Sequence, residues 1–223
     1  MKVRDDPRHP DPAFAALYAA LPDAEDLWPW LDWCAAARPP VLYLGVGAGR
    51  LAVPLHRAGV EIVGVDAHPG MLAHLRRRVP AMQTHQALIE TMRLRRRFDL
   101  VIGPSSILSS DANLAAASRH LRAGGRVGME LMNPLWLRTT SHRGVRLKTG
   151  RVMEVDYMLP GGSKVVQLVE GWRPGPSPRG ARRRLRRFGL EVLWLGGRPG
   201  ASLEASPTYF VLAGRSQLPS RKM

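Results

Sequence analysis

A run of glycines lies between two apolar segments of different periodicity, and this arrangement limits the folds that the chain can adopt. Residues 41–44 (VLYL) are continuously apolar, residues 45–49 (GVGAG) follow, and residues 50–58 have helical spacing. A short, continuously apolar run is typical of a buried parallel strand. Glycines allow the backbone to approach a ligand closely, and a helix N-terminus offers free N–H groups. The pattern therefore predicts a strand, a ligand-binding turn and a helix.

A carboxylate closes the next predicted strand. Residues 61–65 (EIVGV) predict that strand, Asp66 ends it, and Pro69 begins another helix. Asp66 lies 21 residues after Gly45, a spacing at which an acid accepts hydrogen bonds from ribose hydroxyls. The dinucleotide pattern G-x-G-x-x-G fails because Arg50 holds the sixth position, whereas G-x-G-x-G is present. The sequence thus predicts a nucleoside-containing ligand that is not a dinucleotide.

Strand and helix patterns continue to alternate after this unit. Further strands are predicted over residues 82–85, 98–102 and 126–131, with a helix over 112–122 that Asp111 caps and Gly124-Gly125 ends. Five alternations predict an α/β fold with a doubly wound, Rossmann-like and mostly parallel sheet. Right-handed crossovers are expected between its parallel strands.

The two ends of the chain follow different patterns. Residues 11–38 predict two short helices interrupted by prolines, and residues 145–148, 151–158 and 164–170 predict a small antiparallel insertion after the fifth strand. A basic helix (181–188) and two strands (190–195 and 209–213) complete the pattern. We expect a single domain over residues 1–223, divided into a helical cover (1–40), a cofactor-binding core (41–134), a β insertion and loop (135–180), and a C-terminal helix and strand pair (181–214).

Composition narrows the class of protein. The chain has 223 residues, of which 45% are hydrophobic and 23% charged, which predicts a packed globular core. Acidic residues stand where a signal peptide would be apolar, and no segment approaches the roughly 18 apolar residues of a membrane span. We therefore expect a cytoplasmic protein that does not contact membranes. Cys34 is the only cysteine, which excludes an internal disulfide and a thiolate cluster for zinc or iron–sulfur.

Residues 41–72 resemble the first two motifs of the class I S-adenosylmethionine-dependent methyltransferases, in which an apolar strand leads into G-x-G-x-G. Residues 98–102 (FDLVI) are similar to the fourth strand of that family, and residues 121–127 (LRAGGRV) to its Gly-Gly turn and fifth strand. The N-terminal helices and the β insertion are similar to those of its small-molecule branch, including amino-sugar N-methyltransferases. The resemblance implies a seven-stranded sheet, S-adenosyl-L-methionine as cofactor, and methyl transfer to a small-molecule nitrogen or oxygen acceptor.

The resemblance also assigns cofactor-binding positions. They are Gly45, Gly47, Gly49, Asp66, Ala67, Leu88, Ile89 and Ser105. Two acids that the family usually has are replaced: Tyr43 stands two residues before the first glycine, and Leu88 stands where an acid usually binds the adenine amino group. Each lost hydrogen bond is worth about 0.5–3 kcal/mol. A degenerate homologue that binds the cofactor without catalysis therefore stays as an alternative.

No catalytic residue can be assigned from the sequence. The place after the fourth strand reads Gly103–Ser106 (GPSS) and not the Asn/Asp-Pro-Pro-aromatic motif of the branch that methylates amide or base amino groups. Cys34 is interpreted as a buried helix residue, Glu130 is a candidate general base, and no metal site is predicted. The candidates for facing a substrate are Tyr18, Trp28, Ser105, Ser106, Asn133 and Trp136. Core packing is the competing interpretation for the three aromatic residues.

The chain is strongly basic, with 33 Lys and Arg against 18 Asp and Glu, a net charge of +15. Arginine clusters lie at 76–78, 93–97 and 182–187. Such clusters favour an anionic small-molecule substrate, or a solvated arginine-rich surface. An RNA methyltransferase that uses these clusters is the nearest alternative, although no aromatic residues are interleaved with them. The sequence carries no signal for the oligomeric state.

Overall fold

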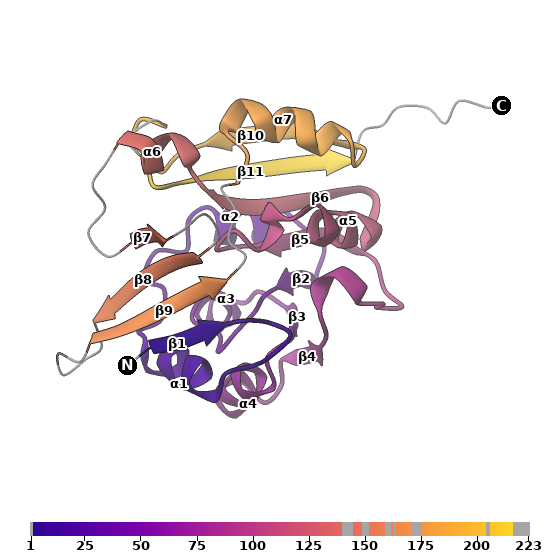
Figure 1. Ribbon diagram of the computed structural model, residues 1–223. Helices are drawn as coiled ribbons and strands as arrows, with labels where there is room; N and C mark the ends of the chain where they lie inside the picture. The colour runs from indigo at the N-terminus through magenta and orange to yellow at the C-terminus, as the bar shows by residue number, and fades with distance from the viewer. Residues whose placement is uncertain are drawn as a thin grey trace.

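The computed structural model describes residues 2–139, 145–148, 152–158, 162, 164–170, 175–203 and 206–215. Its larger sheet has seven strands in the order β10-β11-β6-β5-β2-β3-β4 (Figure 1). These strands are β2 (Val41–Leu44), β3 (Ile62–Asp66), β4 (Gln83–Gln86), β5 (Phe98–Gly103), β6 (Leu121–Met132), β10 (Leu190–Gly196) and β11 (Thr208–Arg215). The five neighbouring strands β6, β5, β2, β3 and β4 are parallel to one another, and β11 is antiparallel to both of its neighbours.

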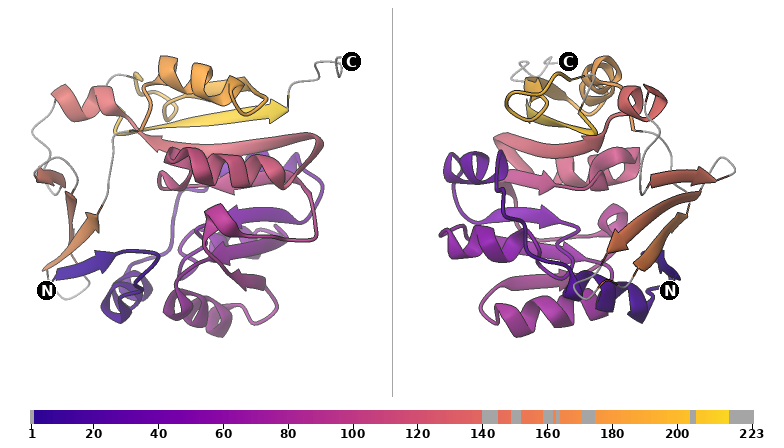
Figure 2. Two further views of the ribbon diagram at one scale, coloured as in Figure 1. Left: turned by 45° about the vertical axis from the view of Figure 1, so that its right-hand side comes forward. Right: turned by 90° about the vertical axis from the view of Figure 1, so that its left-hand side faces the viewer.

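Helices cover both faces of this sheet (Figure 2). The helices are α1 (Pro12–Ala20), α2 (Trp30–Ala35), α3 (Ala52–Arg57), α4 (Pro69–Arg78), α5 (Asp111–Arg119), α6 (Pro134–Thr139) and α7 (Pro178–Arg186), with 3-10 turns η1 (Ile89–Thr91) and η2 (Ile107–Ser109). One core cluster joins α2, α3 and α4 to the sheet, and a second joins η1, α5 and α7 to it. The predicted doubly wound α/β fold is confirmed.

Local sequence explains where the helices begin. Pro12, Pro69 and Pro178 each occupy the first turn of a helix, where a missing N–H costs nothing. The residue before each proline caps its helix with a side-chain acceptor: Asp11 for α1, His68 for α4 and Ser177 for α7. These caps fix the helix starts near the carboxyl ends of the strands.

A second sheet has the order β1-β9-β8-β7, with β1 (Lys2–Asp5), β7 (Val145–Lys148), β8 (Val152–Met158) and β9 (Lys164–Glu170). The pairs β7–β8 and β8–β9 are antiparallel, as predicted. The sequence did not predict β1, which pairs in parallel with β9. The N-terminus therefore joins the insertion sheet to the rest of the molecule, and Val3 is buried with Phe14 and Val165 in a third core cluster.

The predicted boundaries around α5 are wrong, and the helix predicted over residues 181–188 is α7, Pro178–Arg186. Helix α5 ends at Arg119 and β6 begins at Leu121, so the helix does not reach residue 122. Gly124-Gly125 lies inside β6, where the pairing with β5 shifts register. The cap of α5 is Ser110, whose hydroxyl accepts from the N–H of Asn113 at 3.1 Å, and not Asp111.

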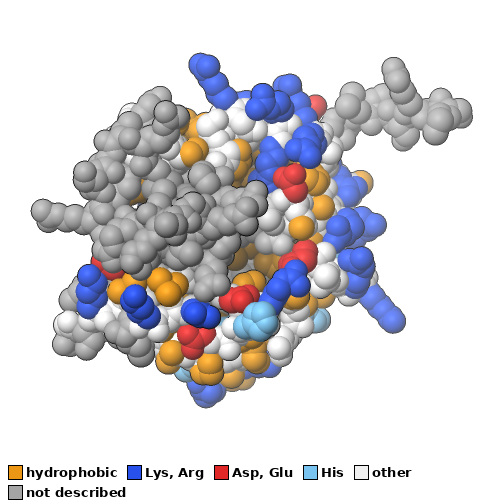
Figure 3. All heavy atoms as spheres, viewed as in Figure 1, with side chains coloured by type: hydrophobic (Ala, Val, Ile, Leu, Met, Phe, Trp, Pro, Cys, Tyr) orange, Lys and Arg blue, Asp and Glu red, His pale blue; other side chains and the backbone are white. Residues whose placement is uncertain are grey.

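The arginine clusters lie at the ends of two helices and directly before one strand. Arg76–Arg78 form the last turn of α4, Arg93–Arg97 precede β5 directly, and Arg183, Arg184 and Arg186 end α7. Cations are favourable at helix C-termini because of the helix dipole. Blue side chains are numerous on the right-hand side of the molecule, where β6 begins in the same view (Figures 1 and 3). Within the described residues, no helix is long and apolar enough to cross a membrane.

Gly128 in β6 tests how tightly α2 packs on the sheet. A Cβ atom there would lie 2.7 Å from the Trp33 ring, so Gly128→Ala should lower the free energy of unfolding by about 1–3 kcal/mol. A Cβ atom at Gly175 would lie 3.5 Å from its nearest neighbour, the carbonyl oxygen of Met132, so Gly175→Ala should change stability by less than about 0.5 kcal/mol. Urea unfolding of both variants measures the difference, and equal stabilities would contradict the packing.

Candidate functional site

The glycine turn lies at the carboxyl end of β2. Gly45, Gly47 and Gly49 have φ angles of 69°, 57° and 91°, a left-handed conformation that glycine adopts without strain. A Cβ at Gly45 would lie 2.7 Å from Ile107, and one at Gly49 would lie 2.6 Å from Leu75. A Cβ at Gly47 would meet nothing within 4 Å. Gly45 and Gly49 therefore serve internal packing as well, whereas Gly47 faces open space.

Asp66 lies against this turn. Its Oδ2 accepts from the N–H of Gly47 at 2.8 Å, and its Oδ1 accepts from the N–H of His68 at 2.8 Å. Burial raises the pKa of the Asp66 carboxyl, and these backbone hydrogen bonds oppose that shift. A carboxylate has about four acceptor positions, so both oxygens keep the capacity to accept from a diol.

His68 is a residue that the sequence analysis missed. Its Nδ1 accepts from the N–H groups of Gly70 (3.1 Å) and Met71 (3.4 Å), which caps α4. Its Nε2 must then carry the proton, and it donates to the carbonyl oxygen of Asp11 at 2.9 Å. His68 thereby holds the N-terminal segment beside Asp66. Its position two residues after the predicted strand-end acid was the only signal in the sequence.

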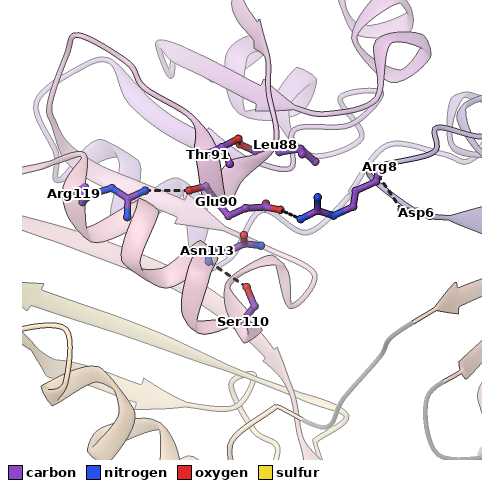
Figure 4. A network of polar contacts seen from close by, with 8 residues as sticks. All are labelled: Asp6, Arg8, Leu88, Glu90, Thr91, Ser110, Asn113 and Arg119. Carbon is purple, nitrogen blue, oxygen red and sulfur yellow. Dashed lines mark hydrogen bonds and ion pairs between the residues drawn. The ribbon is translucent and has the colours of Figure 1, made fainter.

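The residues predicted to contact the adenine ring lie at the start of η1 and directly after β3. Leu88 is half-buried and Ile89 is buried at the start of η1, whereas Ala67 is half-buried after β3. Glu90 joins η1 to two other parts of the chain (Figure 4). Its Oε1 accepts from Nη2 of Arg8 at 2.9 Å, and its backbone oxygen accepts from Nη2 of Arg119 at 3.2 Å. The segment between β1 and α1 therefore contacts both His68, beside Asp66, and η1.

A cavity of about 220 Å³ opens on the other side of the turn. Its lining includes Gly45, Gly47 and Ser105 from the predicted cofactor set, and Tyr18 and Glu130 from the candidates for substrate contact or catalysis. Four aromatic residues contribute to its wall: Tyr18, Trp30, Tyr43 and Phe210. The cavity lies at the carboxyl edge of the parallel strands, where open α/β sheets bind their ligands.

Other candidates for substrate contact do not line this cavity. Trp28 packs against Trp194 and Phe210, with ring centroids 5.8 and 5.3 Å apart. Asn133 is fully buried, and its amide donates to the carbonyl oxygens of Leu203 and Ser206. These two side chains have structural roles. Trp136 and Ser106 also lie outside the cavity lining. The predicted cofactor-binding residues outside it are Gly49, Asp66, Ala67, Leu88 and Ile89.

The corner after β5 holds Glu130 in place. Ser105 and Ser106 have φ angles of 51° and 63°, a left-handed conformation that costs non-glycine residues about 1–2 kcal/mol each. The N–H of Ser105 donates to Oε2 of Glu130 at 2.9 Å, and the N–H of Ser106 donates to the Glu130 carbonyl oxygen at 3.0 Å. The Ser106 hydroxyl accepts from the N–H of Met132 at 2.9 Å. Strain of this kind is concentrated at functional sites.

Tyr43 occupies the position before the turn where the resemblance leads one to expect an acid. Tyr43 is only 5% exposed. Burial, and secondarily the charges of Glu130 and Asp66, raise the pKa of its phenol. Tyr43 therefore stays neutral and contributes a polar but uncharged wall to the cavity. Among the described residues, no group of three or more His, Cys, Asp or Glu side chains is placed to hold a metal ion.

Ser105 provides a test of the strained corner. Ser105→Gly should be about 0.5–1 kcal/mol more stable than Ser105→Ala, because glycine removes the left-handed strain that alanine retains. Both variants keep the backbone N–H that Glu130 accepts. Chemical denaturation compares them directly, and an alanine variant as stable as the glycine variant would show that the corner is not strained.

Asp5 makes the stability of the folded protein depend on pH. Burial raises the pKa of Asp5 to about 6, nearby Asp66 adds to this, and the hydrogen bond from Gln167 opposes it. The folded state then binds this proton more tightly than the unfolded chain does, so stability falls as the pH rises from about 4 to about 6. Asp5→Asn should remove that loss, with a gain of up to about 3 kcal/mol at pH 8 and none below about pH 4.

Thermal unfolding across this pH range measures the difference between Asp5→Asn and the wild type. Asp6→Asn is the matched control, because a hydrogen bond with His9 lowers the pKa of Asp6. Replacing the Asp6 carboxylate should therefore give no gain in stability at high pH. A gain for Asp5→Asn that does not depend on pH would contradict the assignment.

The comparison with known proteins agrees with the fold and the turn. Residues 41–125 match a family model described as a methyltransferase domain. No curated protein sequence matches the chain. Among solved structures, the CcbJ methyltransferase from Streptomyces caelestis is 20% identical, with a TM-score of 0.67 over 95% of this chain and 99% of that chain.

Two further structures are similar. An S-adenosylmethionine-dependent methyltransferase from Clostridium acetobutylicum ATCC 824 is 17% identical, with a TM-score of 0.68 over 91% of this chain and 97% of that chain. CalS10, an amino pentose methyltransferase from Micromonospora echinaspora, is 19% identical, with a TM-score of 0.62 over 92% and 97%. The resemblance to class I S-adenosylmethionine-dependent methyltransferases is confirmed, and the chain has their Rossmann-like fold.

Proposed function

We propose that this protein is a methyltransferase that uses S-adenosyl-L-methionine and acts on a small-molecule nitrogen or oxygen acceptor. The observation that carries the proposal is the pairing of Asp66 with the N–H of Gly47 at the carboxyl edge of the sheet. It combines a carboxylate for a ribose diol with a glycine whose missing side chain leaves open space. The methyltransferase-domain match over residues 41–125 supports the same function.

The residues around the turn fit this cofactor. In the proposal, Asp66 accepts from the ribose hydroxyls, Gly45, Gly47 and Gly49 form the turn beside the cofactor, and Ser105 bounds it at the end of β5. Ala67, Leu88 and Ile89 supply an apolar wall for the adenine ring, which gains affinity through buried area. When bound, the cofactor supplies an electrophilic methyl group on a sulfonium sulfur.

The protein's contribution to the reaction is mainly positioning. A cavity of about 220 Å³ beside the turn holds a small acceptor in line with the methyl group, and such orientation alone supplies a large part of a rate enhancement. Cys34 is no nucleophile, because it is buried in α2 and burial raises the pKa of its thiol to about 12. Methyl transfer then proceeds directly to the acceptor.

An RNA methyltransferase is less well supported. Its arginine clusters would have to face the cofactor edge, whereas those of this chain end α4 and α7 or precede β5. Single side chains from two of them reach toward that edge, where Arg78 donates to the carbonyl oxygen of Ala48 and Arg184 to that of Leu108. The charged side chains that line the cavity are Asp26, Arg50, Glu130 and Arg198. Their formal charges balance, so the cavity itself gives no support to an anionic acceptor.

The turn can be tested with two matched glycines. Gly47 and Gly59 both have a positive φ, and a Cβ at either would meet nothing within 4 Å, so valine should strain both backbones similarly. Only Gly47→Val should place a side chain in the cofactor's space. We expect Gly47→Val to lose S-adenosylhomocysteine binding in calorimetry, while Gly59→Val binds as the wild type does. Equal affinities of the two folded variants would mean that the turn is only structural.

Asp66→Asn tests the ribose contact. Loss of the charge-assisted hydrogen bonds should weaken S-adenosylhomocysteine binding by about 1.5–3 kcal/mol. Asp99→Asn is the control, because Asp99 pairs with Arg122 at the amino edge of the sheet and should leave affinity unchanged. Unchanged affinity in Asp66→Asn, or tighter binding of NAD than of S-adenosylhomocysteine by the wild type, would overturn the proposed cofactor. Binding without methyl transfer to any acceptor would favour the degenerate homologue.

A further inference from the structure

Glu130 is the one charged side chain lining the cavity that has no charged or aromatic partner within the described part of the chain. Arg198 forms an ion pair with Asp26, and its guanidinium lies 5.9 Å from the Phe210 ring. Arg50 donates to the carbonyl oxygen of Pro22 at 2.8 Å, and its guanidinium lies 6.0 Å from the Tyr18 ring. Of the donors in the described ranges, Oε2 of Glu130 accepts only a backbone N–H, that of Ser105. Among the described residues, no cation is therefore placed to pair with this carboxylate at the cavity wall.

We propose that Glu130 binds the amino group of the acceptor as an ammonium ion and then takes its proton, so that the natural acceptor is a primary or secondary amine. This inference rests on the proposed methyltransferase function and narrows it from a nitrogen or oxygen acceptor to an amine. Glu130 is thereby both a binding residue and a general base.

The cavity walls suit a cation. Tyr18, Trp30 and Phe210 line the same space, and aromatic faces attract ammonium groups by up to about 2 kcal/mol when water is excluded. An ammonium–carboxylate hydrogen bond is about twice as strong as a neutral one. The strained Ser105–Ser106 corner holds the carboxylate through the N–H of Ser105 and the Glu130 backbone through the N–H of Ser106, which limits the reorganisation that binding requires.

The proton balance favours an amine over an alcohol. An ammonium ion has no lone pair, so it must first lose one proton, and Glu130 accepts it. The nitrogen lone pair then forms the C–N bond while the bond from the methyl carbon to the sulfonium sulfur breaks, which leaves a methylated ammonium and a neutral thioether. The proton on Glu130 passes to solvent. An alcohol can donate a hydrogen bond to this carboxylate but carries no positive charge, so it forms no ion pair here. Its hydroxyl is also too weakly acidic for a carboxylate to deprotonate before attack.

Matched amines and alcohols test this inference. We suggest titrating benzylamine against benzyl alcohol, and D-glucosamine against D-glucose, into protein saturated with S-adenosylhomocysteine at pH 7. Wild-type protein should bind at least one amine ten-fold or more tightly than its alcohol. Glu130→Gln keeps an oxygen that can accept from the N–H of Ser105, and it should lower amine affinity at least ten-fold while S-adenosylhomocysteine affinity stays within two-fold. Glu61→Gln, at an exposed position beside β3, should behave as the wild type.

Four results would overturn the inference. They are alcohol affinities equal to those of the amines, amine affinity unchanged in folded Glu130→Gln, no binding of any amine to the saturated wild type, and a ten-fold loss of S-adenosylhomocysteine affinity in Glu130→Gln. The last would make Glu130 a ligand of the cofactor's amino-acid end. If the wild type does not bind S-adenosylhomocysteine at all, the proposed function itself fails, and the two failures are thus distinguishable.

Discussion

The hydrogen bond from the N–H of Gly47 to the carboxylate of Asp66, 2.8 Å long, is the contact on which the site depends. It fixes a left-handed glycine turn against the end of β3, so that one carboxylate organises both the turn and the start of α4 through the N–H of His68. A buried carboxylate is costly unless backbone donors satisfy it. This turn supplies those donors and still leaves acceptor capacity facing the ligand.

The same edge of the sheet also brings together segments that are far apart in sequence. The N-terminal strand β1 pairs with β9 of the insertion sheet. In the segment after it, Arg8 contacts Glu90 (Figure 4), and Asp11 contacts His68. The residues proposed to surround the adenosine are thus connected to the insertion sheet through β1. The cavity on the other side of the turn is bounded by α1, the end of β5 and Glu130. Cofactor and acceptor are therefore proposed to meet across the glycine turn.

The core of the fold could be predicted because its signals are local. Residues 41–44 are apolar enough for a buried strand, glycines mark the turn, and prolines mark the helix starts, so the alternation reveals a doubly wound sheet. β1 could not be predicted, because its partner β9 lies about 160 residues along the chain and its own four residues have no strong pattern. Gly124-Gly125 suggested a helix end, but the glycines accommodate an irregularity inside β6.

The candidate site was predictable only in part, for a similar reason. The glycines and Asp66 follow a fixed spacing. The orientation of Glu130 depends instead on two serines in a left-handed conformation, and a pair of serines in a sequence does not predict that conformation. Trp28 and Asn133 stood in plausible places for contacting a substrate. Tertiary packing assigned them instead to an aromatic cluster and to buried backbone hydrogen bonds.

A crystal structure of the protein with S-adenosylhomocysteine tests the account most directly. We predict that both ribose hydroxyl oxygens lie within about 3.2 Å of the Asp66 carboxylate oxygens, that the adenine ring contacts Leu88 and Ile89, and that the sulfur atom faces the cavity lined by Glu130. A ligand bound away from the glycine turn, or one whose ribose points away from Asp66, would contradict it.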